Sequence, residues 1–263
     1  MPVLIRSALA LALLALPVSG AADILTLSHD YDHDGTVLEG WIARPAVDEP
    51  RPAVIVVHQW GGPSDYEKKR ATMLAQEGYV GFVADIYSRG YRPETMEERA
   101  ALSSDYKRDP GMMRTRAGAA IQAVKELPFV DAGKVAIIGY CFGGTIALES
   151  ARAGHDLQGF VSIHGGLSTL APGKAGHVRG RILVQHGEID PLVPPEEVEA
   201  FKREMAEAEA ELRFIAYPGA VHSFTDPSAG DDPSRGVAYD EIADAASWQD
   251  LLIFLAEIFN PVE

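Results

Sequence analysis

The chain has 263 residues, of which 47% are hydrophobic, and it carries a formal net charge of −15 at pH 7. This length and apolar content predict one domain with a full core and argue against disorder. The strong negative charge disfavours nucleic acid and anionic membrane surfaces as partners.

The first 22 residues have the pattern of a secretory signal peptide. Arg6 supplies a short positive region, residues 9–17 are mostly apolar, and residues 19–22 are small. We expect cleavage after Ala21 or Ala22, which leaves residues 23–263 as one domain in the periplasm or outside the cell. An uncleaved membrane anchor is the alternative, disfavoured because the apolar stretch is short for a bilayer span. No membrane contact is expected after cleavage.

The segment after the signal begins like a calcium-binding loop at Asp30 to Gly35. The twelfth loop position is Trp41, however, and not the glutamate that such a loop needs. The dipeptide Asp34-Gly35 instead favours a tight turn between two early strands. We expect the second of these strands over residues 37–44.

From residue 53 onward, buried-strand patterns alternate with helical patterns. Strands are predicted at residues 53–57, 80–84, 135–138, 159–163, 181–185 and 212–217, and helices at 66–77, 93–102, 110–127, 194–209 and 239–259. A further helix is expected to begin near Thr145. Such alternation predicts the α/β class, with a mainly parallel central sheet and helices on both faces.

Residues 139–144, Gly-Tyr-Cys-Phe-Gly-Gly, lie between a predicted strand and a predicted helix. This arrangement is typical of a nucleophile elbow, here with cysteine at the reactive position. The glycines permit the sharp turn, and the N-terminus of the following helix favours a thiolate on Cys141. Cys141 is the only cysteine in the chain, so no internal disulfide can form.

Two more polar residues follow strands at the same expected edge of the sheet. Asp190 comes after the strand at 181–185, and His222 comes after the strand at 212–217. The order of nucleophile, acid and histidine is that of α/β-hydrolases. We therefore expect His222 to take the thiol proton of Cys141 and Asp190 to orient the imidazole. Glu188 remains an alternative for the acid.

Acyl transfer also needs donors for an oxyanion. The backbone N–H of Phe142, directly after the nucleophile, is one expected donor, and that of Trp60, in the loop after the strand at 53–57, is the other. His58 is expected to shape that loop. We expect no metal and no cofactor, since His29 and His33 lie in turn material and residues 139–144 lack the lysine of a phosphate loop.

Over residues 35–260 the chain resembles the dienelactone hydrolase family. The resemblance rests on Gly-Tyr-Cys-Phe-Gly-Gly at 139–144, His-Gly-x-x-Asp ending at Asp190, Gly-x-x-His-Ser-Phe at 219–224, and Ala-Asp-Ile-Tyr at 84–87. It implies an α/β-hydrolase fold, a Cys-Asp-His triad, no cofactor, and hydrolysis of a small ester or enol-lactone. We expect a monomer or a weak homodimer.

The chain departs from the family pattern at two places. Gln59 stands where family members often carry a glutamate that can interact with the thiol. Arg89 matches the first of two arginines that hold a substrate carboxylate in the family, but Thr225-Asp226 occupy the place of the second. Because Asp226 would repel a carboxylate, we predict weak activity on dienelactone itself, unless Arg235 replaces the missing arginine.

The expected substrate-binding residues are thus Gln59, Arg89 and His164, the last of which follows the strand at 159–163 and is expected at the pocket wall. Two alternatives to an esterase or lactonase stay open. One is a non-catalytic or thiol-redox-responsive protein on the same fold. The other is a thioesterase or peptidase with the same triad.

Overall fold

The computed structural model describes residues 23–260, so the expected signal peptide lies outside the described residues. The strands are β1 (Ile24–Ser28), β2 (Tyr31–His33), β3 (Thr36–Leu38), β4 (Gly40–Pro45), β5 (Arg51–Val57), β6 (Val80–Ala84), β7 (Val130–Tyr140), β8 (Gly159–Ile163), β9 (Arg181–Gly187) and β10 (Leu212–Tyr217). The helices are α1 (Asp65–Gln76), α2 (Met96–Arg108), α3 (Pro110–Lys125), α4 (Phe142–Arg152), α5 (Pro195–Glu207) and α6 (Glu241–Phe259), with short 3₁₀ turns η1 (Pro227–Ala229) and η2 (Pro233–Arg235).

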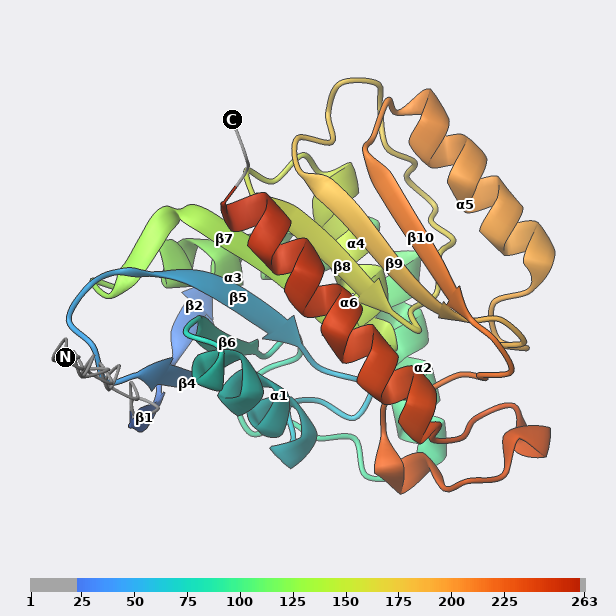
Figure 1. Ribbon diagram of the computed structural model, residues 1–263, viewed down its shortest axis with the longest axis horizontal. Coiled ribbons are helices and arrows are strands. Elements are labelled where there is room, and N and C mark those ends of the chain that lie inside the picture. Colours follow the sequence, from blue (N-terminus) through green and yellow to red (C-terminus); the bar gives the residue numbers. More distant parts are fainter. Residues whose placement is uncertain (1–22, 261–263) are drawn as a thin grey trace, which may run out of the picture.

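One eight-stranded sheet runs through the molecule in the order β1-β4-β6-β5-β7-β8-β9-β10 (Figure 1). The strands from β6 to β10 in this order are parallel to their neighbours, whereas β4 and β1 extend one edge in the antiparallel sense. The predicted α/β class with a mainly parallel sheet is therefore confirmed. The carboxyl ends of the parallel strands share one edge, where ligands of such sheets bind.

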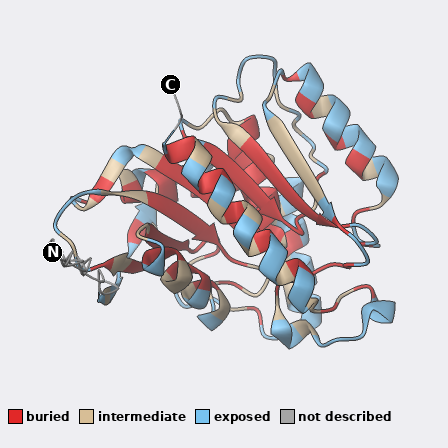
Figure 2. Ribbon diagram, viewed as in Figure 1, coloured by how far each residue is buried: buried red, intermediate tan, exposed pale blue. Residues whose placement is uncertain are grey.

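Helices cover both faces of this sheet (Figure 1). Helices α1 and α6 pack with one set of buried strand residues, and α3, α4 and α5 pack with the other. The central strands are buried on both faces, which explains their continuous apolar sequences (Figure 2). All residues of α4 are buried, so the helix that follows Cys141 has a fixed position in the core.

The early part of the chain confirms one prediction and corrects another. Strands β2 and β3 pair through a tight turn in which Asp34 and Gly35 both have positive φ angles, as the Asp-Gly dipeptide predicted. The single strand predicted at 37–44 is wrong, because β3 and β4 are separate. Glu39 interrupts them: its N–H donates to the Asp85 carboxylate and its carbonyl accepts the Asp85 N–H.

The helix predicted at 93–102 also has different bounds, since α2 spans Met96–Arg108. Thr95 caps its N-terminus and forms a capping box with Glu98, which leaves Pro93 outside the helix. The helix therefore starts three residues later and ends six residues further along the chain than predicted. Across residues 23–260, no helix is both long enough and apolar enough to cross a bilayer.

Candidate active site

Cys141 occupies a sharp turn between the end of β7 and the start of α4. Its backbone has φ 54° and ψ −114°, a conformation that L-residues rarely adopt. A Cβ on Gly139 would lie 2.0 Å from the carbonyl oxygen of Gly143, and a Cβ on Gly143 would lie 2.4 Å from that of Val57. Glycine is thus required on both sides of Cys141 for the helix to approach the strands this closely.

The three predicted triad residues lie together at the carboxyl edge of the sheet. The Nε2 atom of His222 is 3.1 Å from the Sγ atom of Cys141, and its Nδ1 atom is 2.9 Å from Oδ2 of Asp190. The second oxygen of Asp190 accepts the N–H of Leu192 at 2.8 Å, which fixes the carboxylate. Glu188, the alternative acid, is exposed and instead accepts the N–H of Gly219.

The electrostatics of this arrangement favour charge separation between sulfur and imidazole. Burial disfavours an imidazolium, but Cys141 and Asp190 outweigh it and raise the pKa of His222 to about 10. Burial also raises the pKa of the Cys141 thiol, and His222 outweighs this effect, so that the net pKa is lowered. The favoured resting state is a thiolate–imidazolium pair, which makes the sulfur a strong nucleophile.

The sequence analysis predicted two backbone N–H groups, those of Phe142 and Trp60, as donors to an oxyanion. The N–H of Phe142 lies against the Cys141 sulfur and helps to lower the thiol pKa. In the loop after β5, the N–H of Gln59 already donates to Glu67 at 3.1 Å. The N–H groups of Trp60 and Gly61 have no acceptor among residues 23–260, so the N–H predicted at Trp60 is free to donate.

Three side chains that the sequence analysis did not assign to the site hold this loop in place. The buried carboxylate of Glu67 accepts the Gln59 N–H and caps α1 through Ser64. The hydroxyl of Tyr87 donates to the carbonyl of Trp60 at 3.0 Å. Arg92 packs its side chain against Gly62 and donates to the carbonyl of Pro63. The capping box Ser-x-x-Glu at 64–67 is the one signal of this support that the sequence carries.

His58 has the loop-shaping place expected of it. Its Nε2 atom accepts the N–H of Ile86 at 3.0 Å, so its Nδ1–H donates to the carbonyl of Gln59. Burial lowers the pKa of His58 to about 3, which keeps the ring neutral. A neutral ring in this tautomer fixes the path of the chain into the loop after β5.

His164 lies behind the nucleophile rather than at a pocket wall. It is buried, its Nδ1 atom accepts the N–H of Cys141 at 3.1 Å, and its Nε2–H donates to Oγ1 of Thr225 at 2.8 Å. Burial and the charge of His222 hold the pKa of His164 well below its usual range. The contacts continue from Thr225 to Tyr66 and from Tyr66 to Arg70. His164 therefore braces the strained backbone of Cys141.

The two departures from the family pattern are in contact with each other. The side-chain amide of Gln59 donates to Oδ2 of Asp226 at 2.7 Å, and Oδ1 of Asp226 caps η1 through Ser228. Arg89 is not brought to this site: its side chain is 63% exposed and pairs with Asp30 at 2.7 Å. Arg235 is exposed in η2, and no ion pair or hydrogen bond joins its side chain to the triad within the described part of the chain.

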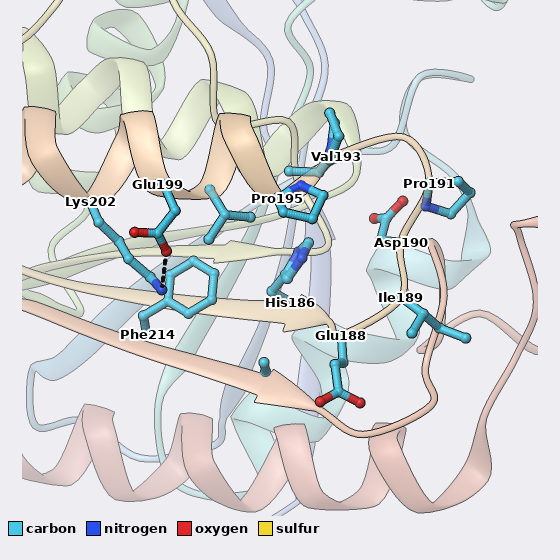
Figure 3. A pocket seen from close by; sticks show the side chains of 13 residues that line it. His186, Glu188, Ile189, Asp190, Pro191, Val193, Pro195, Glu199, Lys202 and Phe214 are labelled. Atoms are coloured by element: carbon cyan, nitrogen blue, oxygen red, sulfur yellow. Dashed lines mark hydrogen bonds and ion pairs between the residues drawn. The ribbon is translucent and has the colours of Figure 1, made fainter.

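A cavity of about 450 Å³ lies between α5 and the ends of β9 and β10 (Figure 3). Asp190 is part of its lining, but Cys141 and His222 are not. Inside it, Lys202 pairs with Glu199 at 3.0 Å and lies over the ring of Phe214. This cavity therefore touches the back of the triad and does not open onto the sulfur. No cluster of residues suited to a metal ion is found between residues 23 and 260.

The parallel sheet, the elbow after β7 and the order of the site residues define an α/β-hydrolase. Residues 38–259 match the model of the dienelactone hydrolase family, and the chain belongs to this family. The predicted family and the predicted enzyme class, a hydrolase, are thereby confirmed.

Individual proteins agree with this assignment. The solved structure of m3DLH is 35% identical, with a TM-score of 0.87, over 92% of this chain and 100% of its own. The structure of a dienelactone hydrolase-like promiscuous phosphotriesterase, P91 from metagenomic libraries, is 34% identical, with a TM-score of 0.84, over 90% of this chain and 99% of its own. A probable 2-oxo-3-(5-oxofuran-2-ylidene)propanoate lactonase from Bradyrhizobium is 27% identical over 88% of this chain and 94% of its own.

Proposed function

We propose that the protein hydrolyses a carboxylic ester or lactone through Cys141, His222 and Asp190, with an acyl-enzyme intermediate. The observation that carries this proposal is the continuous contact from sulfur to imidazole to carboxylate, 3.1 Å and 2.9 Å long. The lactonase name of the Bradyrhizobium relative supports the bond type. The substrate is a small molecule, and no step calls for a cofactor.

In the first half of the reaction, the thiolate of Cys141 attacks the carbonyl carbon, and the oxyanion accepts the N–H groups of Phe142 and Trp60. As the C–S bond is completed and the C–O bond breaks, His222 gives its Nε2 proton to the departing alkoxide. A thioester and a free alcohol result; from a lactone, the alcohol remains on the acyl chain. Asp190 keeps the imidazole in the orientation for both transfers.

In the second half, neutral His222 takes a proton from water, and the resulting hydroxide attacks the thioester. The C–S bond breaks, the carboxylic acid leaves, and the thiolate–imidazolium pair is restored. Each cycle thus consumes one water and no other reactant. Removal of an oxyanion donor from such a site costs about 3–4 kcal/mol in the transition state.

The test is hydrolysis of a panel of 4-nitrophenyl esters and small lactones, including dienelactone, by the wild type and by Cys141→Ala. We expect activity that the substitution abolishes, a trapped mass increase on Cys141 at early times, and a poor rate on dienelactone because of Asp226. Thermal unfolding of both proteins controls for folding. A wild type that cleaves no ester while its thiol reacts rapidly with iodoacetamide contradicts the proposal and favours the thiol-redox alternative. Faster cleavage of thioesters or peptides than of oxygen esters favours the thioesterase or peptidase.

We also propose that the protein is exported and acts in the periplasm or outside the cell as a monomer or weak homodimer. The amino-terminal pattern of Arg6 and the apolar residues after it supports the first part. Sedimentation of the purified mature protein at several concentrations tests the second.

A further inference from the structure

The imidazole of the triad is carried by a loop, residues 218–226, here called the His222 loop. The residue after His222, Ser223, has a positive φ angle of 59°, a conformation that persists in such a residue only where the surrounding structure holds it. The N–H of His222 donates to the carbonyl of Gly236, and the N–H of Ala238 donates to the carbonyl of His222. The His222 loop is thereby joined to the segment that leads into α6, and both must be held together against the sheet.

Arg70, on α1, contacts both of these parts. Its Nη2 atom donates to the carbonyl of Thr225, in the His222 loop, at 2.8 Å, and to Oδ1 of Asp244, in the first turn of α6, at 2.6 Å. Its Nε–H donates to the hydroxyl of Tyr66, one turn earlier on α1, at 3.2 Å. Arg70 is only 5% exposed, so water competes little for these bonds. Because the guanidinium group is planar and its donors have fixed directions, it holds α1, the His222 loop and α6 in one arrangement.

The same guanidinium group lies beside the residue that precedes the nucleophile. Its Cζ atom is 5.5 Å from the centre of the Tyr140 ring and 5.1 Å from the centre of the Tyr66 ring. The two tyrosine rings meet edge to face, with their centres 5.1 Å apart. Tyr140 is the last residue of β7, so its backbone leads directly into Cys141. Arg70 therefore packs between the end of β7 and the His222 loop.

A chain of hydrogen bonds leads from the same contact to the nucleophile. The hydroxyl oxygens of Tyr66 and Thr225 are 2.6 Å apart, and the Thr225 hydroxyl accepts the Nε2–H of His164 at 2.8 Å. The Nδ1 atom of His164 accepts the N–H of Cys141 at 3.1 Å. Thr225 and His164 are both buried. A displacement of Thr225 is thus passed to the backbone of Cys141 as well as to His222, which comes three residues earlier in the chain.

We propose that Arg70 is a positioning residue for the hydrolysis: it fixes the His222 loop against the end of β7 and so sets the contact between the imidazole and the sulfur of Cys141. This inference rests on the proposed function and adds to it a residue outside the triad. Arg70 touches none of the reacting atoms and acts through Thr225. Because a small displacement of a catalytic group is costly, the loss of Arg70 slows the reaction more than it weakens substrate binding.

A second buried arginine provides the matched control. Arg152, on α4, is as buried as Arg70 and pairs with Glu149 and Glu204. It also donates to a backbone carbonyl, that of Leu167. Within residues 23–260, no hydrogen bond or ion pair joins Arg152 to the triad or to the His222 loop. Loss of either arginine therefore disturbs a buried ion pair, but only the loss of Arg70 releases the His222 loop.

The first measurement is kcat and KM on a 4-nitrophenyl ester for Arg70→Met, Arg70→Lys, Arg152→Met and Arg152→Lys, with thermal unfolding of each variant. We expect Arg70→Met to lower kcat roughly 10- to 100-fold with little change in KM. Arg70→Lys keeps the charge beside Asp244 but not the fixed set of donors, so it should recover part of kcat. The Arg152 variants should lose stability and retain kcat. The lysine pair gives the comparison if a methionine variant does not fold.

The second measurement needs no turnover. The rate at which iodoacetamide alkylates Cys141, followed as a function of pH, reports the pKa of the thiol. In the wild type, the contact with His222 holds this pKa below 9.0, its ordinary value, against the effect of burial. Both Arg70 variants should move the thiol pKa towards 9.0, whereas the Arg152 variants should keep the wild-type value. A loss of stability alone changes the unfolding temperature and leaves this pKa in place.

Two results overturn the inference while the proposed function stands. One is a wild-type thiol pKa in Arg70→Met, and the other is an equal loss of kcat in the Arg70 and Arg152 variants. If the wild type cleaves no ester, the proposed function fails. A change in the thiol pKa that is confined to the Arg70 variants then still supports Arg70 as the residue that positions His222.

Discussion

At the scale of single residues, the site depends on a proton that is shared unequally between sulfur and imidazole. Cys141 and His222 shift each other's pKa in opposite directions, and Asp190 adds to the shift on the imidazole side. The pair is reactive only when the sulfur has lost its proton and the ring has kept its own. This requirement sets both limits of the active pH range.

The first prediction concerns that range. The kcat/KM value for a neutral aryl ester should rise at a pH below 9.0, the ordinary thiol value, because the pKa of Cys141 is lowered. It should fall near pH 10, where His222 loses the proton that the leaving group needs. A rate profile from pH 4 to 11, with protein stability checked at each pH, measures both limbs. A profile that still rises at pH 10 contradicts the ion pair.

Gln59 gives the second prediction at this scale. Its amide donates to Asp226, and Gln59→Glu would place two carboxylates in direct contact. Like charges this close cannot both ionise freely, so one carboxyl takes up a proton and a new ionisation appears on the acid side of the rate profile. The double variant Gln59→Glu/Asp226→Asn should lose that ionisation. Identical profiles for the wild type and Gln59→Glu would show that the pair does not influence the thiol.

At the scale of elements, the loop after β5, which contains Gln59 and Trp60, is held by residues of α1 and of the segment after β6. Glu67 fixes one N–H of the loop, and Tyr87 fixes the carbonyl of Trp60. The N–H of Trp60 has no protein acceptor among residues 23–260 and is therefore free for the proposed role as an oxyanion donor. The geometry of the loop is thus set before substrate arrives, which is the condition for efficient oxyanion stabilisation.

Tyr87→Phe tests this support. The substitution leaves the Trp60 carbonyl without its donor, and we expect kcat to fall about fivefold with little change in KM, since a net hydrogen bond is worth about 1 kcal/mol. Tyr106→Phe is the matched control, because its ring also packs against Phe142 and its hydroxyl donates at the same distance of 3.0 Å, but to the Ile86 carbonyl and not to the loop after β5. Both variants should lose similar stability on thermal unfolding. An equal loss of kcat in both variants would show that the hydrogen bond from Tyr87 to the Trp60 carbonyl has no specific role in catalysis.

The sequence could predict the parts of the site that depend on local patterns. The glycines around Cys141 and the strands before Asp190 and His222 are local signals, and the sheet then brings the three residues to one edge. Arg89 was misleading because its partner, Asp30, lies far from it in the chain. His164 was predicted at the pocket wall, but its Nδ1 atom accepts the N–H of Cys141; strand position alone does not tell on which side of Cys141 a residue lies.

At the scale of the whole molecule, the chain carries a net charge of −15. Surface acids keep the protein soluble and repel anions at long range. We therefore expect kcat/KM for an ester that carries a carboxylate to rise with ionic strength, because salt screens this repulsion, while kcat/KM for a neutral ester of equal chain length stays nearly constant.

Export is the prediction that belongs to the full chain. When the gene is expressed in a Gram-negative host, the mature protein should begin at Ala22 or Asp23 and collect in the periplasmic fraction or the medium. Amino-terminal sequencing and intact mass measure the cleavage point, and Arg6→Glu, which removes the positive charge before the apolar stretch, should reduce export. A full-length chain in the membrane fraction would instead support the uncleaved anchor.

The lone cysteine at the elbow has a practical consequence. Because the chain contains one thiol and that thiol is the proposed nucleophile, one equivalent of an alkylating reagent labels one active site and nothing else. The fraction of enzyme with the folded site can be counted from the rapid phase of labelling near neutral pH, since the lowered pKa makes Cys141 react faster than the thiol of an unfolded chain. Turnover numbers for variants such as Tyr87→Phe can then be expressed per competent molecule, free of differences in purity or partial inactivation.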